Sequence, residues 1–541
     1  METCVHGLKS APATALCVRT VPNRAHRLRC VSGALLAVMS IAPPLTAQRG
    51  GRVTSPLRGL DAWTTRALAD WGVPGLAVAV VKDDSVVYAR GFGVRRLGDT
   101  ARVTDRTLFA VGSTSKAFTA ATLAVLVDSG LVKWDDPVSQ HLTGFQLHDP
   151  YVTRELKVRD LLTHRSGLAR GDGIWWATPY SREEVLRRVR HLEPSWSFRS
   201  TYGYQNIMFL AAGQIVPAVT GQTWDEFVKR RFFEPLGMTG SNTSVAALDT
   251  AGDVATPHSP VEGRMRPIAW RNIDNIGPAG SINSSVRDMA QWIRLQLGGG
   301  VYRGRRLLSA AAMREMHAPQ TIVALDTLSE RLWPSTHFRA YGLGWALSDY
   351  RGRKLVAHGG AIDGMRAQVT LVPEERLGVV VLANGGEPSR LLTQAVAFHV
   401  VDAYLGGGAA DWSTELLALR RRQEARDSTE RTKRERERVA ATKPSFALER
   451  YAGTYRSEMY GDVTVTLENG TLVMTFAPNF TGDLTHWHFD TFEARWRDPM
   501  MGRSSVAFAL DAQGKIKELV WSGFGAFGRV ESPPEARAGA R

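Results

Sequence analysis

The chain has 541 residues, more than a single hydrophobic core usually serves, and this length predicts two or more domains. Hydrophobic residues make up 44% and charged residues 22%, as in ordinary soluble globular proteins. The net charge is +14, but neither a basic-aromatic platform nor a nucleic-acid motif accompanies it, so nucleic acid is excluded as a partner. Cys4, Cys17 and Cys30 are the three cysteines, which excludes thiol catalysis, disulfides and cysteine-bound metal in the rest of the chain.

The first 47 residues are predicted to be a secretory signal peptide. Arg24, Arg27 and Arg29 precede an apolar run at 31–42, and a small-residue cleavage pattern ends at Ala47. The apolar run is too short to span a bilayer, so we expect no transmembrane helix after processing. We therefore expect a free exported protein, periplasmic or extracellular. The alternative is an unprocessed tail or an organellar transit peptide.

Strand patterns flank a long helical region within residues 48–405. A β-hairpin is predicted at 73–94, and helical patterns extend from 113 to about 300. Further strands are predicted at 341–347, 354–358, 365–372 and 377–383. Strands at both ends with helices between them predict an α+β fold, an antiparallel sheet flanked by helices with an all-helical region.

The composition changes after this first domain. Basic and acidic residues alternate within 406–445, with pairs such as Asp427–Arg431 at i,i+4 spacing, which predicts a charged helical linker in solvent. Residues 446–532 alternate with a period of two, which predicts a β-meander domain. We expect this domain to serve as an oligomerisation or lid module, and we favour this role over a separate binding pocket. The last residues, 533–541, are expected to be a disordered tail.

The segment from Ser113 to Lys116 is the candidate catalytic centre. A serine and a lysine three residues apart lie one turn apart on the same face of a helix. A serine hydroxyl is a poor nucleophile at neutral pH and needs a nearby base, which this spacing supplies. The chain contains this spacing once, between an apolar approach at 108–112 and a helix with an apolar face at 117–123.

Two further segments follow in chain order. Tyr204-Gln205-Asn206 is the single Tyr-x-Asn of the chain, and His358-Gly359-Gly360 follows a strand-like run. The three motifs in this order resemble those of the serine β-lactamases and penicillin-binding proteins, which meet in one cleft. Framework segments at 71–81, 158–168 and 234–238 resemble the class C-related branch, and the resemblance covers about residues 55–405.

The resemblance implies a role for each motif. Ser113 would be the nucleophile, and either Lys116 or Tyr204 would be its base, a division of labour that the sequence leaves open. Asn206 would orient Lys116 and contact the substrate amide. The oxyanion hole would consist of two backbone N–H groups, those of Ser113 and Ala361.

The third motif departs from the family pattern. Gly359 and Gly360 would let a substrate approach the strand edge closely. His358 stands where β-lactamases and transpeptidases usually have lysine, and a mostly neutral histidine does not anchor a substrate carboxylate. This weakens the case for penicillin-type substrates, and histidine here resembles the esterase and D-aminopeptidase branches.

The sequence thus predicts an exported serine hydrolase that cleaves an ester or amide bond, D-amino-acid peptides included, through a Ser113 acyl-enzyme. The expected partner is a small-molecule or peptide substrate, with no cofactor and no metal. The alternatives are a β-lactamase or D-alanyl-D-alanine carboxypeptidase, and a catalytically silent receptor or scaffold on the same fold. The C-terminal meander resembles the lipocalin-like half-barrel of some relatives, through which the chain would form homo-oligomers.

Overall fold

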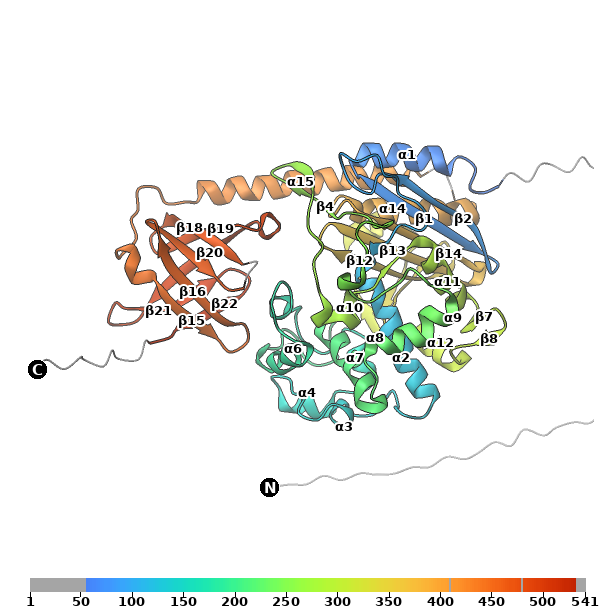
Figure 1. The fold of residues 1–541 in the computed structure, drawn as a ribbon, viewed down its shortest axis with the longest axis horizontal. Helices are drawn as coiled ribbons and strands as arrows, with labels where there is room; N and C mark the ends of the chain where they lie inside the picture. The colour runs from blue at the N-terminus through green and yellow to red at the C-terminus, as the bar shows by residue number, and fades with distance from the viewer. Residues whose placement is uncertain (1–54, 408–409, 478–479, 532–541) are drawn as a thin grey trace, which may run out of the picture. The chain divides into compact units, whose positions relative to one another are not determined.

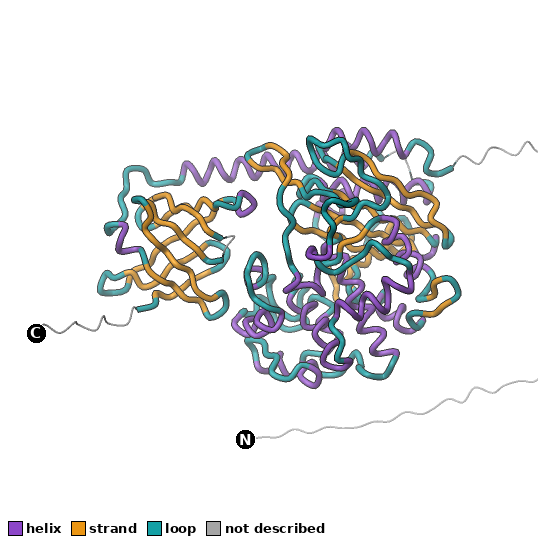
Figure 2. The backbone as a smooth tube through the Cα atoms, in the orientation of Figure 1, coloured by secondary structure: helices purple, strands orange, loops and turns teal. Residues whose placement is uncertain are grey.

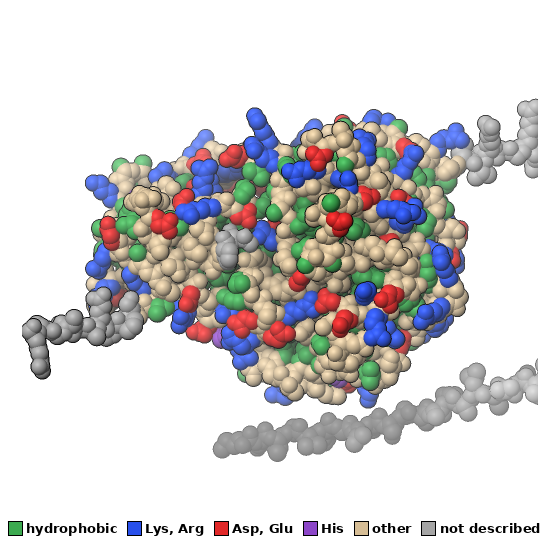
Figure 3. Space-filling view, viewed as in Figure 1, with side chains coloured by type: hydrophobic (Ala, Val, Ile, Leu, Met, Phe, Trp, Pro, Cys, Tyr) green, Lys and Arg blue, Asp and Glu red, His purple; other side chains and the backbone are tan. Residues whose placement is uncertain are grey.

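A computed structural model describes residues 55–407, 410–477 and 480–531. The predicted signal peptide and C-terminal tail, 1–47 and 533–541, lie outside the described residues. Among the described helices, none is both long and apolar enough to cross a membrane. Lys and Arg side chains are scattered over the face drawn in Figure 3 rather than gathered in one patch.

An eight-stranded antiparallel sheet forms the centre of the first domain (Figure 1). Its strand order is β2-β1-β14-β13-β12-β11-β10-β9, so that β1, early in the chain, pairs with β14, with Val78 opposite Val381. The strands are β1 Gly75–Lys82, β2 Ser85–Gly93, β9 Thr321–Val323, β10 Arg339–Tyr341, β11 Ala346–Tyr350, β12 Arg353–Ile362, β13 Met365–Val372 and β14 Leu377–Ala383. The predicted α+β architecture is confirmed, and β9 is a strand that the sequence did not indicate. The single strand predicted at 341–347 is wrong, because residues 342–345 form the connection between β10 and β11.

Both faces of this sheet are covered by helices. Val78 and Val80 of β1 pack with α1 (Leu60–Trp71) and α14 (Ser389–Leu405), whereas Ala77 and Ala79 face the other layer, with α11 (Val286–Leu297). A strand buried on both faces reads as a continuous apolar run, as Gly75–Lys82 does.

The helical layer is built around α2 (Ser115–Asp128), in which every residue up to Leu126 is buried. A helix that is apolar all round belongs in a core, and α2 contacts α7, α8, α10 and α12. Figure 2 shows these helices in purple beside the orange sheet. The helices of this region are α3 Val138–His141, α4 Pro150–Glu155, α5 Val158–Leu161, α6 Arg182–Arg188, α7 Ile207–Thr220, α8 Trp224–Val228, α9 Glu234–Leu236, α10 Gly277–Gly280 and α12 Ala310–Met316. Helix α13 (Thr327–Leu332) instead packs against the core of α1 and α14, through Leu328 and Leu332.

One long helix, α15 (Trp412–Arg436), occupies the charged segment between the two β regions. Its first turns are packed, because Trp412 and Leu416 are buried in the same core as α14. Nearly all residues from 421 to 440 are exposed. The segment is therefore a helix with one anchored end and one solvated end.

The C-terminal domain is a closed antiparallel barrel of eight strands, where the sequence predicted a half-barrel. The sheet closes because β22 returns to pair with β15, with Tyr455 opposite Arg529. The strands are β15 Gly453–Ser457, β16 Gly461–Glu468, β17 Thr471–Thr475, β18 Thr481–His488, β19 Thr491–Trp496, β20 Arg503–Leu510, β21 Ile516–Trp521 and β22 Gly525–Arg529. Large aromatic side chains such as Phe492, Phe508 and Trp521 fill its interior.

We predict that limited trypsin digestion cuts first between residues 421 and 442. This stretch is exposed and rich in arginine, and it has few core contacts to lose on opening. Arg420, at the packed end of the same helix and with 24% of its side chain exposed, is the internal control and should be cut later. Mass spectrometry of the first fragments checks this, and early cleavage inside 113–300 would contradict the predicted domain boundaries.

Candidate active site

Ser113 lies in a single 3-10 turn, Gly112–Thr114, that leads directly into α2. Side chains at positions i and i+3 eclipse one another in such a turn, and Lys116 Nζ lies 3.0 Å from Ser113 Oγ. Ser115, whose side chain points the other way, donates to the Gly112 carbonyl oxygen at 2.8 Å and fixes the turn. The predicted serine–lysine pair is therefore brought together by local backbone geometry.

The turn is pressed against strand β12 at two glycines. Gly112 has a φ of 52°, in the left-handed region, and a Cβ there would lie 2.5 Å from the backbone nitrogen of Ala361. A Cβ on Gly360 would lie only 1.9 Å from the carbonyl oxygen of Val111. These two approaches place Ala361 directly beside the turn that carries Ser113.

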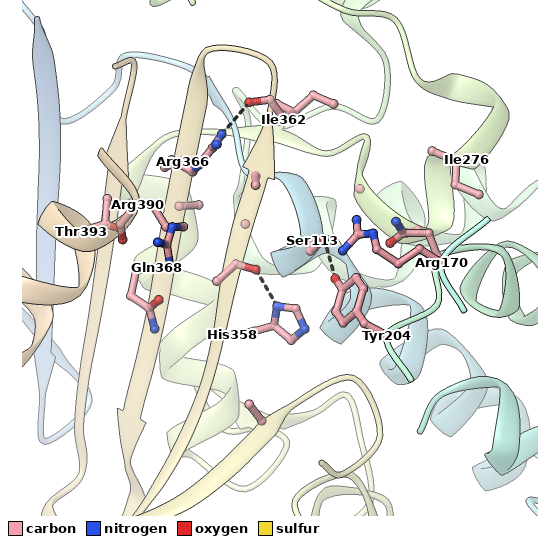
Figure 4. A pocket seen from close by; sticks show the side chains of 18 of the residues that line it. Ser113, Arg170, Tyr204, Ile276, His358, Ile362, Arg366, Gln368, Arg390 and Thr393 are labelled. Atoms are coloured by element: carbon pink, nitrogen blue, oxygen red, sulfur yellow. Dashed lines mark hydrogen bonds between the residues drawn. The ribbon is translucent and has the colours of Figure 1, made fainter. Parts of the chain in front are cut away.

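The second motif meets the first from the loop before α7. Tyr204 Oη donates to Ser113 Oγ at 2.8 Å, the contact drawn as a dashed line in Figure 4. Lys116 Nζ donates to Asn206 Oδ1 at 2.7 Å and to the carbonyl oxygen of Ala279, in α10, at 2.8 Å. The candidate nucleophile and its two candidate bases thus form one hydrogen-bonded cluster.

Burial shifts the pKa values of both candidate bases. Lys116 has no exposed surface, and its desolvation lowers the pKa of its amine well below the usual range, with a smaller opposing effect from Asp172. Burial raises the pKa of the Tyr204 hydroxyl far above its usual range, despite the hydrogen bond to Ser113. Desolvation therefore favours the neutral form of both groups.

The third motif lies on β12, facing the same cluster. His358 Nδ1 donates to the carbonyl oxygen of Gly359 at 2.6 Å, so its Nε2 accepts from Tyr341 Oη at 2.8 Å. Burial lowers the pKa of His358 to about 3. The imidazole is neutral at pH 7, and both of its nitrogens already have partners.

A cleft of about 370 Å³ opens over this cluster. Strand β11 pairs with β12 only as far as Ala357. On that side of β12, the described residues place no strand beside the segment from His358 to Ala361, which pairs with β13 on its other side. The cleft lining combines polar, aromatic and aliphatic side chains, including Ser113, Arg170, Trp175, Tyr202, Tyr204, Asn206, Ile276, Tyr341, His358 and Ile362. Across 55–407, 410–477 and 480–531, no group of three or more His, Cys, Asp and Glu side chains is arranged to hold a metal ion.

The sequence did not indicate several residues of this site. Arg170 precedes the short 3-10 turn Asp172–Ile174 and Asp172 begins it, both beside the catalytic cluster, and Tyr341 holds His358. Ala279 contributes only its carbonyl oxygen, which carries no sequence signal. Tyr341 is the first residue of the strand predicted at 341–347. The alternation of side chains along a strand, which can place Tyr341 on the sheet face that bears His358, was the one available clue.

Two family models match the chain. Residues 60–400 match the family model described as Beta-lactamase, and residues 437–532 match a domain of unknown function (DUF3471). "Unguisins hydrolase ungD'" of Aspergillus campestris (strain IBT 28561) is 30% identical over 417 residues, which cover 74% of this chain and 76% of the relative. "D-aminopeptidase" of Brucella anthropi is 28% identical over 375 residues, covering 65% of this chain and 64% of the relative.

One solved structure shares the fold over most of the chain. It is the octameric penicillin-binding protein homologue from Pyrococcus abyssi, with a TM-score of 0.58 at 22% identity. The match covers 87% of this chain and 99% of the other. At this identity the likeness is one of fold.

We predict that Gly360→Ala destabilises the protein by about 1–3 kcal/mol or more, because the new methyl group would overlap the backbone oxygen of Val111. Gly359→Ala is the matched control, since its Cβ would meet the Gln368 side chain at 3.4 Å and the Ala367 carbonyl oxygen at 3.8 Å, both ordinary contact distances. Thermal unfolding measures both, and equal melting temperatures for the two variants would contradict the close packing of β12 on the Ser113 turn.

Proposed function

The chain belongs to the β-lactamase family of serine hydrolases, and on this premise we propose that it cleaves an ester or amide bond through an acyl-enzyme on Ser113. The hydrogen-bonded cluster of Ser113, Lys116 and Tyr204 at the floor of the cleft carries this proposal. A nucleophile with a base at 3.0 Å and a second proton carrier at 2.8 Å has what acyl transfer requires.

Lys116 is the base of the proposed mechanism. A neutral amine has two N–H donors and one lone pair, and the oxygens of Asn206 and Ala279 can only accept. These two oxygens take both N–H groups, which leaves the lone pair facing Ser113 Oγ. The lowered pKa of Lys116 favours this neutral form. The serine proton then moves to Nζ as Oγ attacks the substrate carbonyl.

Tyr204 is the proton donor of the proposed mechanism. Its raised pKa makes a phenolate at neutral pH unfavourable, so it is a poor first base. As the tetrahedral intermediate collapses, the bond from carbon to the leaving group breaks, and the leaving group takes the proton of Tyr204 Oη. The Lys116 ammonium returns a proton to the phenolate. Water repeats the sequence to hydrolyse the acyl-enzyme and restores Ser113.

The backbone N–H groups of Ser113 and Ala361 are the proposed oxyanion hole. The contact between Gly112 and Ala361 supports this assignment, because it keeps the two segments side by side without intervening side chains. Donors of this kind act on the charge that develops in the transition state, and each is worth about 3 kcal/mol of barrier lowering.

We propose an uncharged ester or amide as the preferred substrate class, with D-amino-acid peptides among the candidates. The neutral His358 supports this preference, since it supplies no fixed positive charge where a substrate carboxylate would bind. The name of one relative, a D-aminopeptidase, supports hydrolysis of an amide. A β-lactamase or carboxypeptidase activity is the alternative. The filled catalytic positions disfavour a silent scaffold. Export and homo-oligomers formed through the C-terminal barrel stay predictions from the sequence.

We predict that Ser113→Ala lowers hydrolysis of p-nitrophenyl esters by about 10³-fold or more, because the oxygen that forms the acyl-enzyme is lost. A fluorophosphonate probe should label the wild-type protein and leave the variant unlabelled. Thermal unfolding is the control, and the two melting temperatures should agree closely. Labelling that persists on Ser113→Ala would contradict the proposed nucleophile.

We predict that His358→Lys shifts the ratio of kcat/KM values toward substrates with a carboxylate beside the scissile bond. The reason is that the variant places a positive charge where the wild type has a neutral ring. His358→Gln is the matched control, since it stays uncharged and should keep the wild-type preference. Parallel assays with neutral esters, D- and L-amino-acid anilides and nitrocefin measure this. A wild-type enzyme that prefers nitrocefin to every neutral ester would contradict the proposed substrate class.

A further inference from the structure

One carboxylate beside the catalytic cluster has no part in the mechanism above. Asp172 begins a short 3-10 turn, and its Oδ1 accepts from Asn206 Nδ2 and from Trp175 Nε1, both at 2.9 Å. Its Oδ2 accepts from Arg170 Nε at 2.5 Å. About a quarter of the Asp172 side chain is exposed, so it lies at the edge of the cleft, with Asn206 between it and Lys116.

The amide of Asn206 must point in one direction for Lys116 to act as a base. Its oxygen accepts from Lys116 at one end, and its nitrogen donates to Asp172 at the other. If the amide were reversed, its N–H would face Nζ and draw the lysine lone pair toward Asn206. That lone pair would then no longer face Ser113 Oγ. A carboxylate, which can only accept, forbids the reversed amide.

We propose that Asp172 is a positioning residue for acylation, which holds the Asn206 amide so that the lone pair of Lys116 faces Ser113. This inference rests on the proposed role of Lys116 as the base. Asp172 does not touch the nucleophile, and it orients Lys116 through Asn206. Trp175 and Arg170 complete the hydrogen bonding of its two oxygens and keep the carboxylate in place.

The charge of Asp172 has a second effect on Lys116, which can be measured separately from the orientation of the Asn206 amide. Lys116 is surrounded by Tyr204 and His164, by His358 on β12, and by the charged pair of Arg170 and Asp172. Desolvation is the main cause of its lowered pKa; the Asp172 charge opposes it and the Arg170 charge adds to it. Losing the Asp172 charge therefore lowers the pKa of Lys116 further. Since the active form has a neutral Lys116, the rising limb of kcat/KM against pH should move to lower pH.

Two substitutions separate the two effects. Asp172→Asn removes the charge but keeps an oxygen that can accept from Asn206, so the limb should shift to lower pH while most of kcat is retained. Asp172→Ala removes the acceptor as well, and we expect the same direction of shift with a kcat lower by about 10- to 100-fold. Asp105→Asn is the matched control, because Asp105 forms an equally short ion pair, 2.5 Å to Arg287, with 20% exposure. It should change neither the limb nor kcat.

A double-mutant cycle decides whether Asp172 acts through Asn206. In the Asn206→Ala background, Asp172→Ala should lower kcat little further, since there is no amide left to orient. Equal losses in both backgrounds, or a lowered kcat with an unmoved limb, would overturn the inference. Fluorophosphonate labelling separates this failure from a failure of the proposed function. If Ser113→Ala abolishes labelling while the losses at positions 172 and 206 are additive, the proposed nucleophile stands and only the role of Asp172 is refuted.

Discussion

The site depends on one buried amine. Lys116 has no exposed surface, and removing an ammonium from water costs several kcal/mol unless the charge is neutralised or fully hydrogen-bonded. Its nitrogen has three oxygen neighbours, on Ser113, Asn206 and Ala279, from three different parts of the chain. The fold therefore holds the lysine in a place where the neutral form is favoured and where only one direction is left for its lone pair.

The surrounding architecture keeps that place intact. Helix α2 is buried on all sides up to Leu126, and the turn that carries Ser113 leads directly into it. The glycine contacts between the Ser113 turn and β12 join the helical layer to the sheet through backbone atoms alone. Backbone contacts leave little room for adjustment, which is what preorganised donors for a developing negative charge require.

The sequence predicted the elements whose signals are local. The serine–lysine spacing, the single Tyr-x-Asn and the hairpin at 73–94 each depend on neighbouring residues, and the structure contains the corresponding turn, loop and strands. The sequence predicted the meander but not its closure, because closure depends on the pairing of β22 with β15, which lie far apart in the chain.

Contacts between distant residues left no such signal. Asp172 meets Asn206 across 34 positions, and His358 meets Tyr341 across 17, so neither partner could be chosen from spacing. Sequence reasoning found that His358 is neutral, but burial, rather than its ordinary pKa, is the main reason. It left the choice between Lys116 and Tyr204 open, because that choice depends on which buried group keeps its proton.

The pH dependence of phosphonylation tests this account most directly. The rate constant for fluorophosphonate labelling of Ser113 reports the protonation state of the base, and it does not depend on the departure of a substrate leaving group. A neutral Lys116 predicts a rate that reaches its plateau with a midpoint well below 10.5, the ordinary pKa of lysine, and that loses this dependence in Lys116→Ala. A rate that keeps rising through about pH 10, as a tyrosine phenolate or an ordinary lysine would give, would contradict it.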